Sequence, residues 1–424
     1  MEVLRRATSQ HPLVEVARAR VAAATGARRA AGTLPNPILT YAVENTGFPG
    51  RQAPQGLDRE TQTYATLPLE PLFQRRPRVR RANEDLKAAN AVLARARQLV
   101  ALDAARAFFR VAAAQIAVEG AEDVRARLAE IVTFNQARVN EGVASEADLI
   151  RAQLELDRLA ASVTLERVEL LRARADFSTY VTGPADAWVE MTVAEPVLAG
   201  GLGPDLLRVS IEDAAAFGDL SGSPQLGELL ARAQAAHPDL VASRARAASA
   251  SAEVGYQQAL TIRQVGATMG TKRSAGLTSM IAGVSLPIPL FDRNRGEILR
   301  AVGERTAAEQ ELAWAERQVA AEVQAAYEAA RLLTDQATRL RGSFLNRAAE
   351  SLRLAVAAYQ EGAVTLLQVF DASRTLADAR LSYYQTVFEQ RQRLLELQMA
   401  VGASPLDALI SPSSRPLRPS GVRP

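Results

Sequence analysis

Apolar residues recur at every seventh position along four long stretches of this chain. A sustained period of seven is typical of helices that pack along one another as a coiled coil, and alanine between the larger residues allows a close approach. Only Gly120 interrupts the helix-compatible residues 77–139, so the expected helices are longer than those of a globular domain. The pattern therefore predicts two long helical hairpins. Their seam residues are Val79, Leu86, Leu93 and Val100; Leu149, Leu156, Val163, Leu170 and Phe177; Leu312, Val319, Ala326, Leu333 and Leu340; and Val369, Leu376 and Tyr383.

The same landmarks occur twice in the same order, which indicates a tandem duplication. The matching pairs, 218 to 226 positions apart, are His11-Pro12 and His237-Pro238, Pro71-Leu72-Phe73 and Pro289-Leu290-Phe291, and Glu141-Gly142 and Glu361-Gly362. Each repeat is expected to contain a helix, two strands and a long hairpin whose turn holds Gly142 or Gly362. The predicted organisation is a first repeat at 1–183, an inter-repeat segment at 184–224, a second repeat at 225–402 and a disordered tail at 403–424.

Four shorter stretches, at 38–45, 61–67, 263–271 and 277–287, alternate apolar with small polar residues. This alternation predicts strands with one apolar and one polar face, although Ile281 interrupts the polar face of the last strand. On the alternation alone, a half-buried hairpin of a soluble protein is the more frequent explanation. The residues expected on the apolar face, which would contact lipid if the strands crossed a membrane, are Val265, Ala267, Met269, Met280, Ala282 and Val284.

The length of the hairpins favours a membrane β-barrel over a soluble hairpin. Helices this long have no globular body on which to lie, and two short strand pairs cannot shield each other. Four strands are too few for a barrel, which needs about eight. Open strand edges in lipid would leave backbone groups without hydrogen bonds. The predicted fold is therefore mainly α with a small β part, in which several copies combine their strands into one barrel.

Composition removes several classes of function. The absence of cysteine excludes disulfides, thiolate metal sites and a lipid-modified N-terminal cysteine. The only two histidines, His11 and His237, each precede a proline that can begin a helix, so a capping or loop role is expected rather than metal binding. The net charge of +3 comes from interleaved acidic and basic residues, so no nucleic-acid partner is expected. No enzyme motif occurs, and no cofactor is expected.

The sequence also bears on location. No stretch approaches the roughly 18 apolar residues of a membrane-spanning helix. Met1–Gln10 is polar and lacks the apolar core of a signal peptide. Either the protein remains in the cytosol, or the numbering begins after a leader that was removed or missed.

The layout resembles the TolC-like family of outer membrane efflux channels over about residues 1–402. The most specific stretch is 359–376, Tyr-Gln-Glu-Gly-Ala-Val-Thr-Leu-Leu-Gln-Val-Phe-Asp-Ala-Ser-Arg-Thr-Leu, which looks like the second periplasmic turn of that family. Residues 285–291, Ser-Leu-Pro-Ile-Pro-Leu-Phe, are similar to its strand-to-helix transition. Residues 34–39, Leu-Pro-Asn-Pro-Ile-Leu, resemble the branch that serves cobalt–zinc–cadmium and copper–silver efflux pumps.

The resemblance implies a homotrimer whose twelve strands form one barrel in outer membrane lipid, with twelve helices continuing as a tunnel across the periplasm. Its tip would dock onto a periplasmic adaptor and an RND-type inner membrane pump. The inter-repeat segment would wrap the waist of the tunnel. The channel would be a passive duct without enzymatic activity, for heavy-metal cations or for drugs, since the sequence does not identify the cargo.

The resemblance also implies a periplasmic constriction. Asp371 matches one acidic position of its ring, and Tyr359 matches a tyrosine of the closed-state network. The other acidic position is Gln368, and a bracing arginine is replaced by Val364, so the gate of the family is half present. Asp148 occupies the position of the first repeat that corresponds to Gln368 and could supply the charge. An alternative for Asp371 is stabilisation of a helix N-terminus, and the sequence does not separate the two.

Two other functions remain open at this stage. A soluble coiled-coil scaffold, or a periplasmic adaptor, would also contain helical hairpins. An adaptor has one hairpin flanked by compact β domains, whereas this chain has two hairpins and little other β sequence. The arginines at positions 75, 76, 78, 80 and 81 are expected to form a solvated, interfacial cluster rather than a ligand site.

Overall fold

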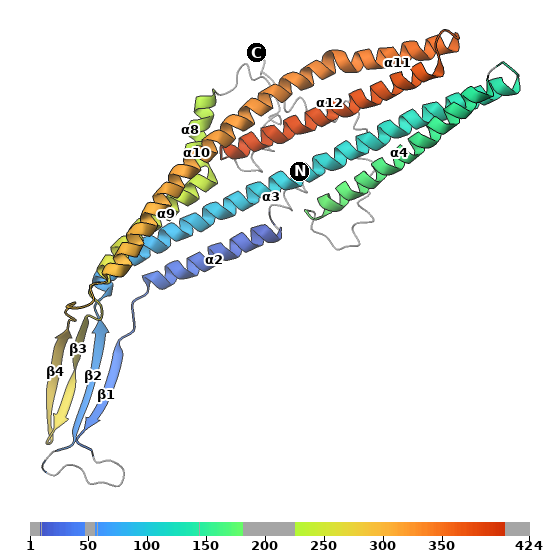
Figure 1. Cartoon of the computed structure of the whole chain (residues 1–424). Helices are drawn as coiled ribbons and strands as arrows, with labels where there is room; N and C mark the ends of the chain where they lie inside the picture. The colour runs from blue at the N-terminus through green and yellow to red at the C-terminus, as the bar shows by residue number, and fades with distance from the viewer. Residues whose placement is uncertain are drawn as a thin grey trace, which may run out of the picture. The chain divides into compact units, whose positions relative to one another are not determined.

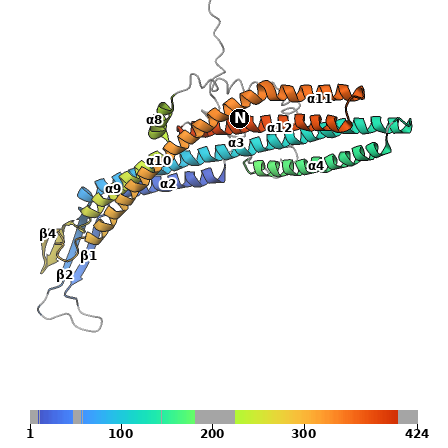
Figure 2. The same ribbon diagram turned by 45° about the horizontal axis from the view of Figure 1, so that its top comes forward.

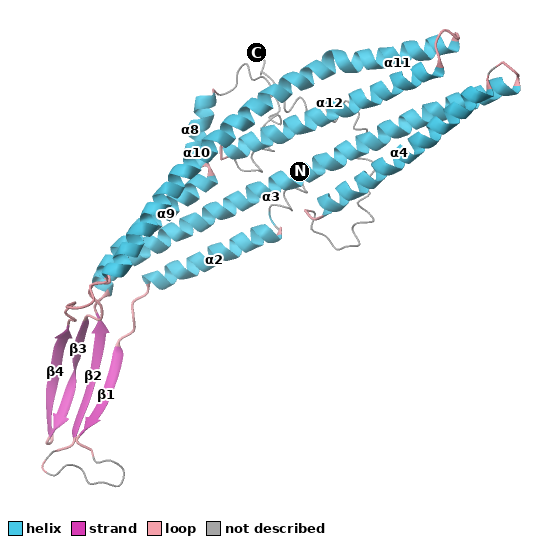
Figure 3. Cartoon of the chain, viewed as in Figure 1, coloured by secondary structure: helices cyan, strands magenta, loops and turns pink. Residues whose placement is uncertain are grey.

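The computed structural model describes residues 11–46, 58–143, 145–180 and 225–402, together with Ser9 and Gly56. These residues form long helices and one four-stranded antiparallel sheet (Figures 1 and 3), as the sequence predicted. The predicted inter-repeat segment and tail lie outside the described residues. In chain order the elements are α2 (Pro12–Gly32), β1 (Ile38–Glu44), β2 (Glu60–Pro68), α3 (Pro71–Asn140), α4 (Glu146–Ser178), α8 (Leu226–Ala236), α9 (Pro238–Ala259), β3 (Gly266–Ser274), β4 (Leu277–Ser285), α10 (Arg295–Arg339), the π-helix η2 (Leu340–Phe344), α11 (Leu345–Gln360) and α12 (Leu366–Ala400).

The chain divides into two compact units that cut across the sequence repeats. The strand-bearing unit comprises Val16–Leu93 and Pro238–Arg317, and the hairpin unit comprises Met1–Glu15, Ala94–His237 and Gln318–Pro424. The boundaries of the repeats themselves stay a prediction. Among the described residues, no helix combines the length and the apolar character needed to cross a membrane.

The sheet has the strand order β1-β2-β3-β4, so β1 and β4 are its two edges. Residues paired across antiparallel strands point to the same face. One face, named here the apolar face, contains Leu39, Tyr41, Val43, Ala65, Leu67, Ala267, Met269, Met280, Ala282 and Val284, and toward its far end also Thr61, Thr63, Thr271, Arg273 and Thr278. The other, named the polar face, contains Thr40, Glu44, Glu60, Gln62, Thr66, Thr268, Lys272 and Ser279, and also the less polar Ile38, Ala42, Tyr64, Leu277 and Ile281. Five of the six residues expected on the apolar face are thus in strands and share a face.

The sixth residue, Val265, precedes the strand, because β3 begins at Gly266 and ends at Ser274, three residues later at each end than the predicted stretch. The carbonyl oxygen of Val265 instead accepts a hydrogen bond from the backbone N–H of Leu69, at 2.8 Å. Of the glycines in the sheet, Gly270 has the least space for a side chain. A Cβ atom placed on it would lie 2.2 Å from the carbonyl oxygen of Thr63 in β2, so only glycine allows this approach of the two strands.

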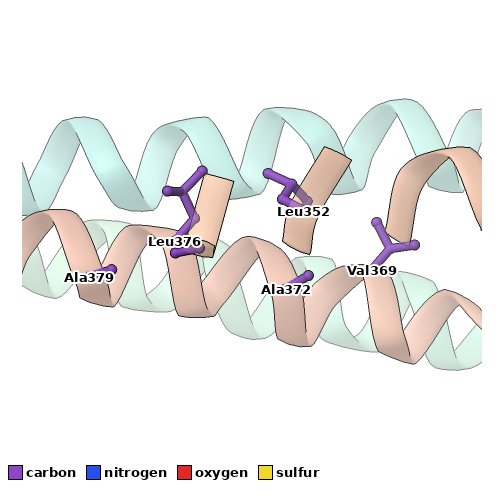
Figure 4. Packing of buried hydrophobic residues seen from close by; sticks show 6 residues of the cluster. Leu352, Val369, Ala372, Leu376 and Ala379 are labelled. Carbon is purple, nitrogen blue, oxygen red and sulfur yellow. The ribbon is translucent and has the colours of Figure 1, made fainter. Parts of the chain in front are cut away.

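The long helices bury the predicted heptad seam within the two units. Every seam residue is at least partly buried, which confirms the period of seven. Helices α11 and α12 lie side by side in both views (Figures 1 and 2), and alanines between the larger residues keep them close. Figure 4 shows part of this core, in which the residues labelled are Leu352, Val369, Ala372, Leu376 and Ala379.

The second long helix also runs without a gap, from Arg295 to Gln360, as the sequence predicted, but it contains a π turn that the sequence analysis did not anticipate. Helix α3 is α-helical throughout, whereas its counterpart consists of the contiguous segments α10, the π-helix Leu340–Phe344 and α11. A π turn bonds residue i to i+5, so it absorbs an additional residue without ending the helix. The spacing between repeats grows from 218 at Pro71 and Pro289 to 220 at Gly142 and Gly362, so the second copy does carry additional residues in this region.

Within the hairpin unit, each half of the chain returns to its own start. The ring of His11, before α2, stacks on the ring of Tyr180, after α4, with centroids 5.7 Å apart. Gly402, after α12, lies against the end of α8, where a Cβ on this glycine would be 2.7 Å from the Cβ of Ala236. His11 also caps α2, since its Nδ1 accepts a hydrogen bond from the N–H of Leu13 at 3.3 Å.

Candidate functional site at the hairpin turns

The two hairpin turns are built in the same way. Gly142 and Gly362 both have a φ of +76°, in the left-handed region that glycine enters at no steric cost. The N–H after each glycine bonds back to the helix, from Val143 to the carbonyl of Arg138 and from Ala363 to that of Ala358, both at 2.9 Å. This is the Schellman end of a helix, and it satisfies carbonyl groups that would otherwise lack donors.

Each returning helix begins with a hydroxyl residue followed three places later by an acid or amide. In the second turn, Oε1 of Gln368 accepts a hydrogen bond from the N–H of Thr365 at 3.2 Å, which is half of a capping box. In the first turn, Ser145 and Asp148 have the same spacing, and Asp148 is the third residue of α4; its side chain lies outside the described residues. Gln368 therefore has a structural task beside any role in a constriction.

Tyr359 joins the second hairpin to the first. Its hydroxyl donates a hydrogen bond to Oδ1 of Asn135 in α3 at 3.0 Å, and Asn135 is buried. The ring of Phe134 meets the Tyr359 ring edge to face, with centroids 6.4 Å apart. The guanidinium of Arg138 lies 5.8 Å from the centre of the Phe134 ring, a cation–π distance. The contacts of Tyr359 with Asn135 and Phe134 thus connect the two hairpins close to their turns.

Asp371 is exposed and is the sixth residue of α12. The stabilising effect of a carboxylate on the helix dipole falls off within the first turn, so the alternative role left open for Asp371 is disfavoured by its position. Its carbonyl oxygen accepts a hydrogen bond from the Thr375 hydroxyl at 2.6 Å, which leaves the carboxylate uninvolved in that contact. The constriction role of Asp371 stays a prediction.

The structure thus brings Tyr359, Gln368 and Asp371 to one end of the second hairpin, with Asn135 and Phe134 added from the first. Sequence reasoning did not single out Asn135 or Phe134. Asn135 lies 224 positions from Tyr359 and has no distinctive neighbours in sequence, so nothing local indicated a partner. The capping box around Gln368 was visible as Thr-x-x-Gln and was missed.

An ion-pair network farther along the hairpin unit stabilises the ionised form of Glu396. Burial acts to raise the pKa of its carboxyl, but hydrogen bonds from Arg106, Gln392 and Arg393 lower it, and the net pKa lies below the usual value of a glutamate. The Arg106 contact crosses from α3 to α12 at 2.6 Å. Within the part of the chain that is described, no group of three or more His, Cys, Asp and Glu residues could hold a metal ion.

Comparison with known proteins finds similarity to outer membrane efflux proteins. Residues 229–403 match the family model described as outer membrane efflux protein. The cobalt-zinc-cadmium resistance protein CzcC of Cupriavidus metallidurans is 25% identical over 377 residues, which are 88% of this chain and 82% of CzcC. The chain is therefore similar to outer membrane efflux proteins over residues 229–403 by the family model, and over most of its length by the alignment with CzcC.

Two solved structures are similar in fold. The outer membrane protein VceC from Vibrio cholerae aligns with a TM-score of 0.72 at 19% identity, over 95% of this chain and 96% of VceC. A structure of CusC aligns with a TM-score of 0.71 at 16% identity, over 95% of this chain and 91% of the CusC chain. These alignments confirm the fold of long helices with a four-stranded sheet.

Proposed function

We propose that three copies of this chain form the outer membrane duct of a tripartite efflux system, with four strands from each copy in one barrel of twelve. The observation that carries the proposal is the sheet itself, which has an exposed apolar face, a hydrogen-bonded polar face and two unpaired edges. Such a sheet cannot close alone, because about eight strands are needed for a barrel. Copies joined edge to edge would remove every open edge from the lipid.

The chemistry of the two faces supports a barrel wall. Met269, Met280 and Val284 on the apolar face are each exposed to 68% or more. On the polar face, Lys272 forms an ion pair with Glu60, and Gln62 donates to Glu44 at 3.1 Å. The hydroxyl groups of Thr66 and Thr268 lie 3.1 Å apart. An apolar surface facing lipid and a polar surface facing a wet lumen is the arrangement of membrane barrels.

The helical hairpins would continue the barrel as a tunnel across the periplasm, with the turns at Gly142 and Gly362 forming its tip. A periplasmic adaptor and an RND-type inner membrane pump would dock there, and the pump would supply the energy. Three copies of Asp371, related by the threefold axis, would place a ring of carboxylates near the tip. Tyr359, through Asn135, would hold the two hairpins of a copy together.

We propose metal cations as the cargo, on the strength of the similarity to a protein named for cobalt, zinc and cadmium resistance. The described residues contain no cluster that would retain a metal ion. A duct without such a cluster lets cations pass without trapping them, so the selection of cargo would fall to the pump. A strain from which the gene for this chain is deleted should become more sensitive to cobalt, zinc or cadmium salts, and unchanged sensitivity to all three would contradict this choice of cargo.

The assembly can be tested with the purified chain in detergent. A trimer by native mass spectrometry that conducts ions in planar bilayers is the expected result. A monomer that is soluble without detergent and does not conduct would overturn the proposal in favour of a soluble scaffold.

The tip can be tested with Asp371→Asn, which should weaken the cation selectivity of the conductance. Asp378→Asn is the matched control, because it removes the same charge from an exposed residue of α12 two helical turns farther from the end. Equal effects of the two substitutions would show that Asp371 does not form the constriction.

A further inference from the structure

We propose that two proline-containing segments of neighbouring copies pack against each other where the sheet joins the helices, and that this contact seals the barrel at each junction between copies. The pre-β1 segment is 34–37, Leu-Pro-Asn-Pro, and the post-β4 segment is 286–291, Leu-Pro-Ile-Pro-Leu-Phe. The proposal rests on the proposed trimer and names a second copy of this chain as the partner of each segment.

Strand topology places the two segments together. The sheet is antiparallel throughout, so β1 begins and β4 ends at the same end of the sheet, the end that joins the helices (Figure 3). These strands are also its two free edges. If β4 of one copy pairs with β1 of the next in the same antiparallel sense, the chain leaving β4 runs beside the chain entering β1.

The inner strands already show this arrangement within one copy. The chain leaves β2 at Pro68 and enters β3 at Gly266, and the two flanking stretches are bonded to each other. The N–H of Leu69 donates to the carbonyl of Val265 at 2.8 Å, and Nε2 of Gln74 donates to the carbonyl of Ile262 at 3.0 Å. Because the chain is a duplication, the corresponding neighbour of the post-β4 segment belongs to another copy.

The two outer segments share the pattern Leu-Pro-x-Pro. In an extended chain, successive N–H groups point to opposite sides, so prolines at alternate positions remove the donors along one side. Backbone pairing between strands therefore does not extend into these two segments. A contact between the segments of neighbouring copies has to be made by side chains instead. The exposed fractions are 67% for Leu34, 74% for Ile288 and 100% for Phe291, so apolar surface is available on both segments.

Both segments are anchored at their helical ends, so docking would cost little conformational entropy. The guanidinium of Arg78 donates to the carbonyl groups of Ala31 and Thr33, at 2.8 and 2.9 Å, immediately before the pre-β1 segment. After the post-β4 segment, the buried side chain of Asn294 donates to the carbonyl of Gln257 at 2.7 Å. Two of the arginines expected in a solvated cluster, Arg75 and Arg78, thus bond the end of α2.

The absence of cysteine makes disulfide trapping a direct test. Leu34→Cys should be combined in turn with Leu286→Cys, Ile288→Cys and Leu290→Cys in the full chain. The trimer is measured first by native mass spectrometry in detergent, and the sample is then oxidised mildly and run on a non-reducing denaturing gel. At least one pair is expected to give a covalent trimer, because each copy contributes one cysteine to each of two junctions.

The matched control pairs Leu34→Cys with Leu72→Cys. Leu72 is equally exposed, but it follows the inner strand β2, so no link between copies is expected there. A conducting trimer in which none of the three pairs links would overturn the inference and leave the proposed function intact. A chain that neither trimerises nor conducts would overturn both.

A membrane surface is the competing partner for these apolar side chains. Single variants Leu34→Cys and Ile288→Cys labelled with bimane can be reconstituted in vesicles of brominated phosphatidylcholine. Little quenching is expected if the segments are covered by a neighbouring copy. Strong quenching at both positions would show that lipid covers them and would overturn the inference.

Discussion

The sheet and the helical hairpins of this chain are both amphipathic, but they satisfy their apolar surfaces differently. Val369 in a hairpin is 2% exposed, whereas Met269 in the sheet is 68% exposed within the single chain. The hairpins find their apolar partners in the same copy, through a seam of period seven. The sheet has to find them outside, in lipid and in further copies. The hairpins can therefore be stable within a single copy, whereas the sheet requires lipid and further copies to cover its apolar face and its edges.

The largest effect is expected from Gly270→Ala, which attacks the sheet directly. Its new Cβ would lie 2.2 Å from the carbonyl oxygen of Thr63, so β2 and β3 would have to separate, at a cost of about 4 kcal/mol or more. Unheated denaturing gels should show that the trimer is lost. Gly283→Ala in β4 is the control, because a Cβ there would meet nothing within 4 Å. Equal behaviour of the two variants would contradict the close approach at Gly270.

Leu128→Ala attacks the hairpins instead. Leu128 is fully buried in α3, and its truncation should lower the free energy of unfolding by about 2–5 kcal/mol. Leu165→Ala in α4, where the side chain is exposed, should change it by about 0.5 kcal/mol or less. Helix content followed by circular dichroism against urea would measure both. A large effect at Leu165 would mean that its surface is covered in the assembly.

Ala267→Arg and Thr268→Arg separate the two faces of the sheet. Arginine at Ala267, on the apolar face, should destabilise membrane insertion by about 2–4 kcal/mol if the site lies near the midplane. Arginine at Thr268, on the polar face, should be tolerated and should change the conductance. Refolding into vesicles followed by bilayer recording would measure both effects. Comparable damage at the two positions would show that the faces are assigned wrongly.

The smallest effect is expected from Glu396→Gln, which probes polar contacts within the hairpins. The lowered pKa of Glu396 means that its ionised form stabilises the fold above the unfolded-state pKa, and that this stability is lost as the pH falls through the folded-state pKa. The variant should therefore be less stable at pH 7, by about 1–2 kcal/mol. The difference should shrink below about pH 4, near the ordinary pKa of glutamate. Thermal unfolding at the two pH values measures this, and a difference independent of pH would contradict the ion-pair explanation.

Periodic features of the fold could be predicted from the sequence, since both the seam of period seven and the strands of period two are local patterns repeated over many residues. Val369, Leu376 and Tyr383 are buried as their spacing indicated. The strand ends were less certain, because Val265 continues the alternation but its carbonyl bonds a neighbouring chain segment rather than the ladder.

Features that depend on distant partners could not be predicted. The Tyr359–Asn135 hydrogen bond joins two helices whose pairing is set by the whole hairpin unit. The π turn at Leu340–Phe344 could not be placed from the spacing between the repeats, which shows additional residues in this region but not where the helix accommodates them. For the candidate constriction, the sequence identified residues by their position in the family pattern. It did not show that the side chain of Gln368 caps a helix, because that contact is visible only in the structure.

The contacts of His11 with Tyr180 and of Gly402 with Ala236 bear on how such a protein could arise. When the beginning and the end of a folding unit are in contact, its coding sequence can be duplicated in tandem without changing the structure of either copy. A short linker is then enough to join the end of the first copy to the beginning of the second. Substitutions could then accumulate separately in the two copies, so that the long helix of one remains α-helical throughout while that of the other acquires a π turn.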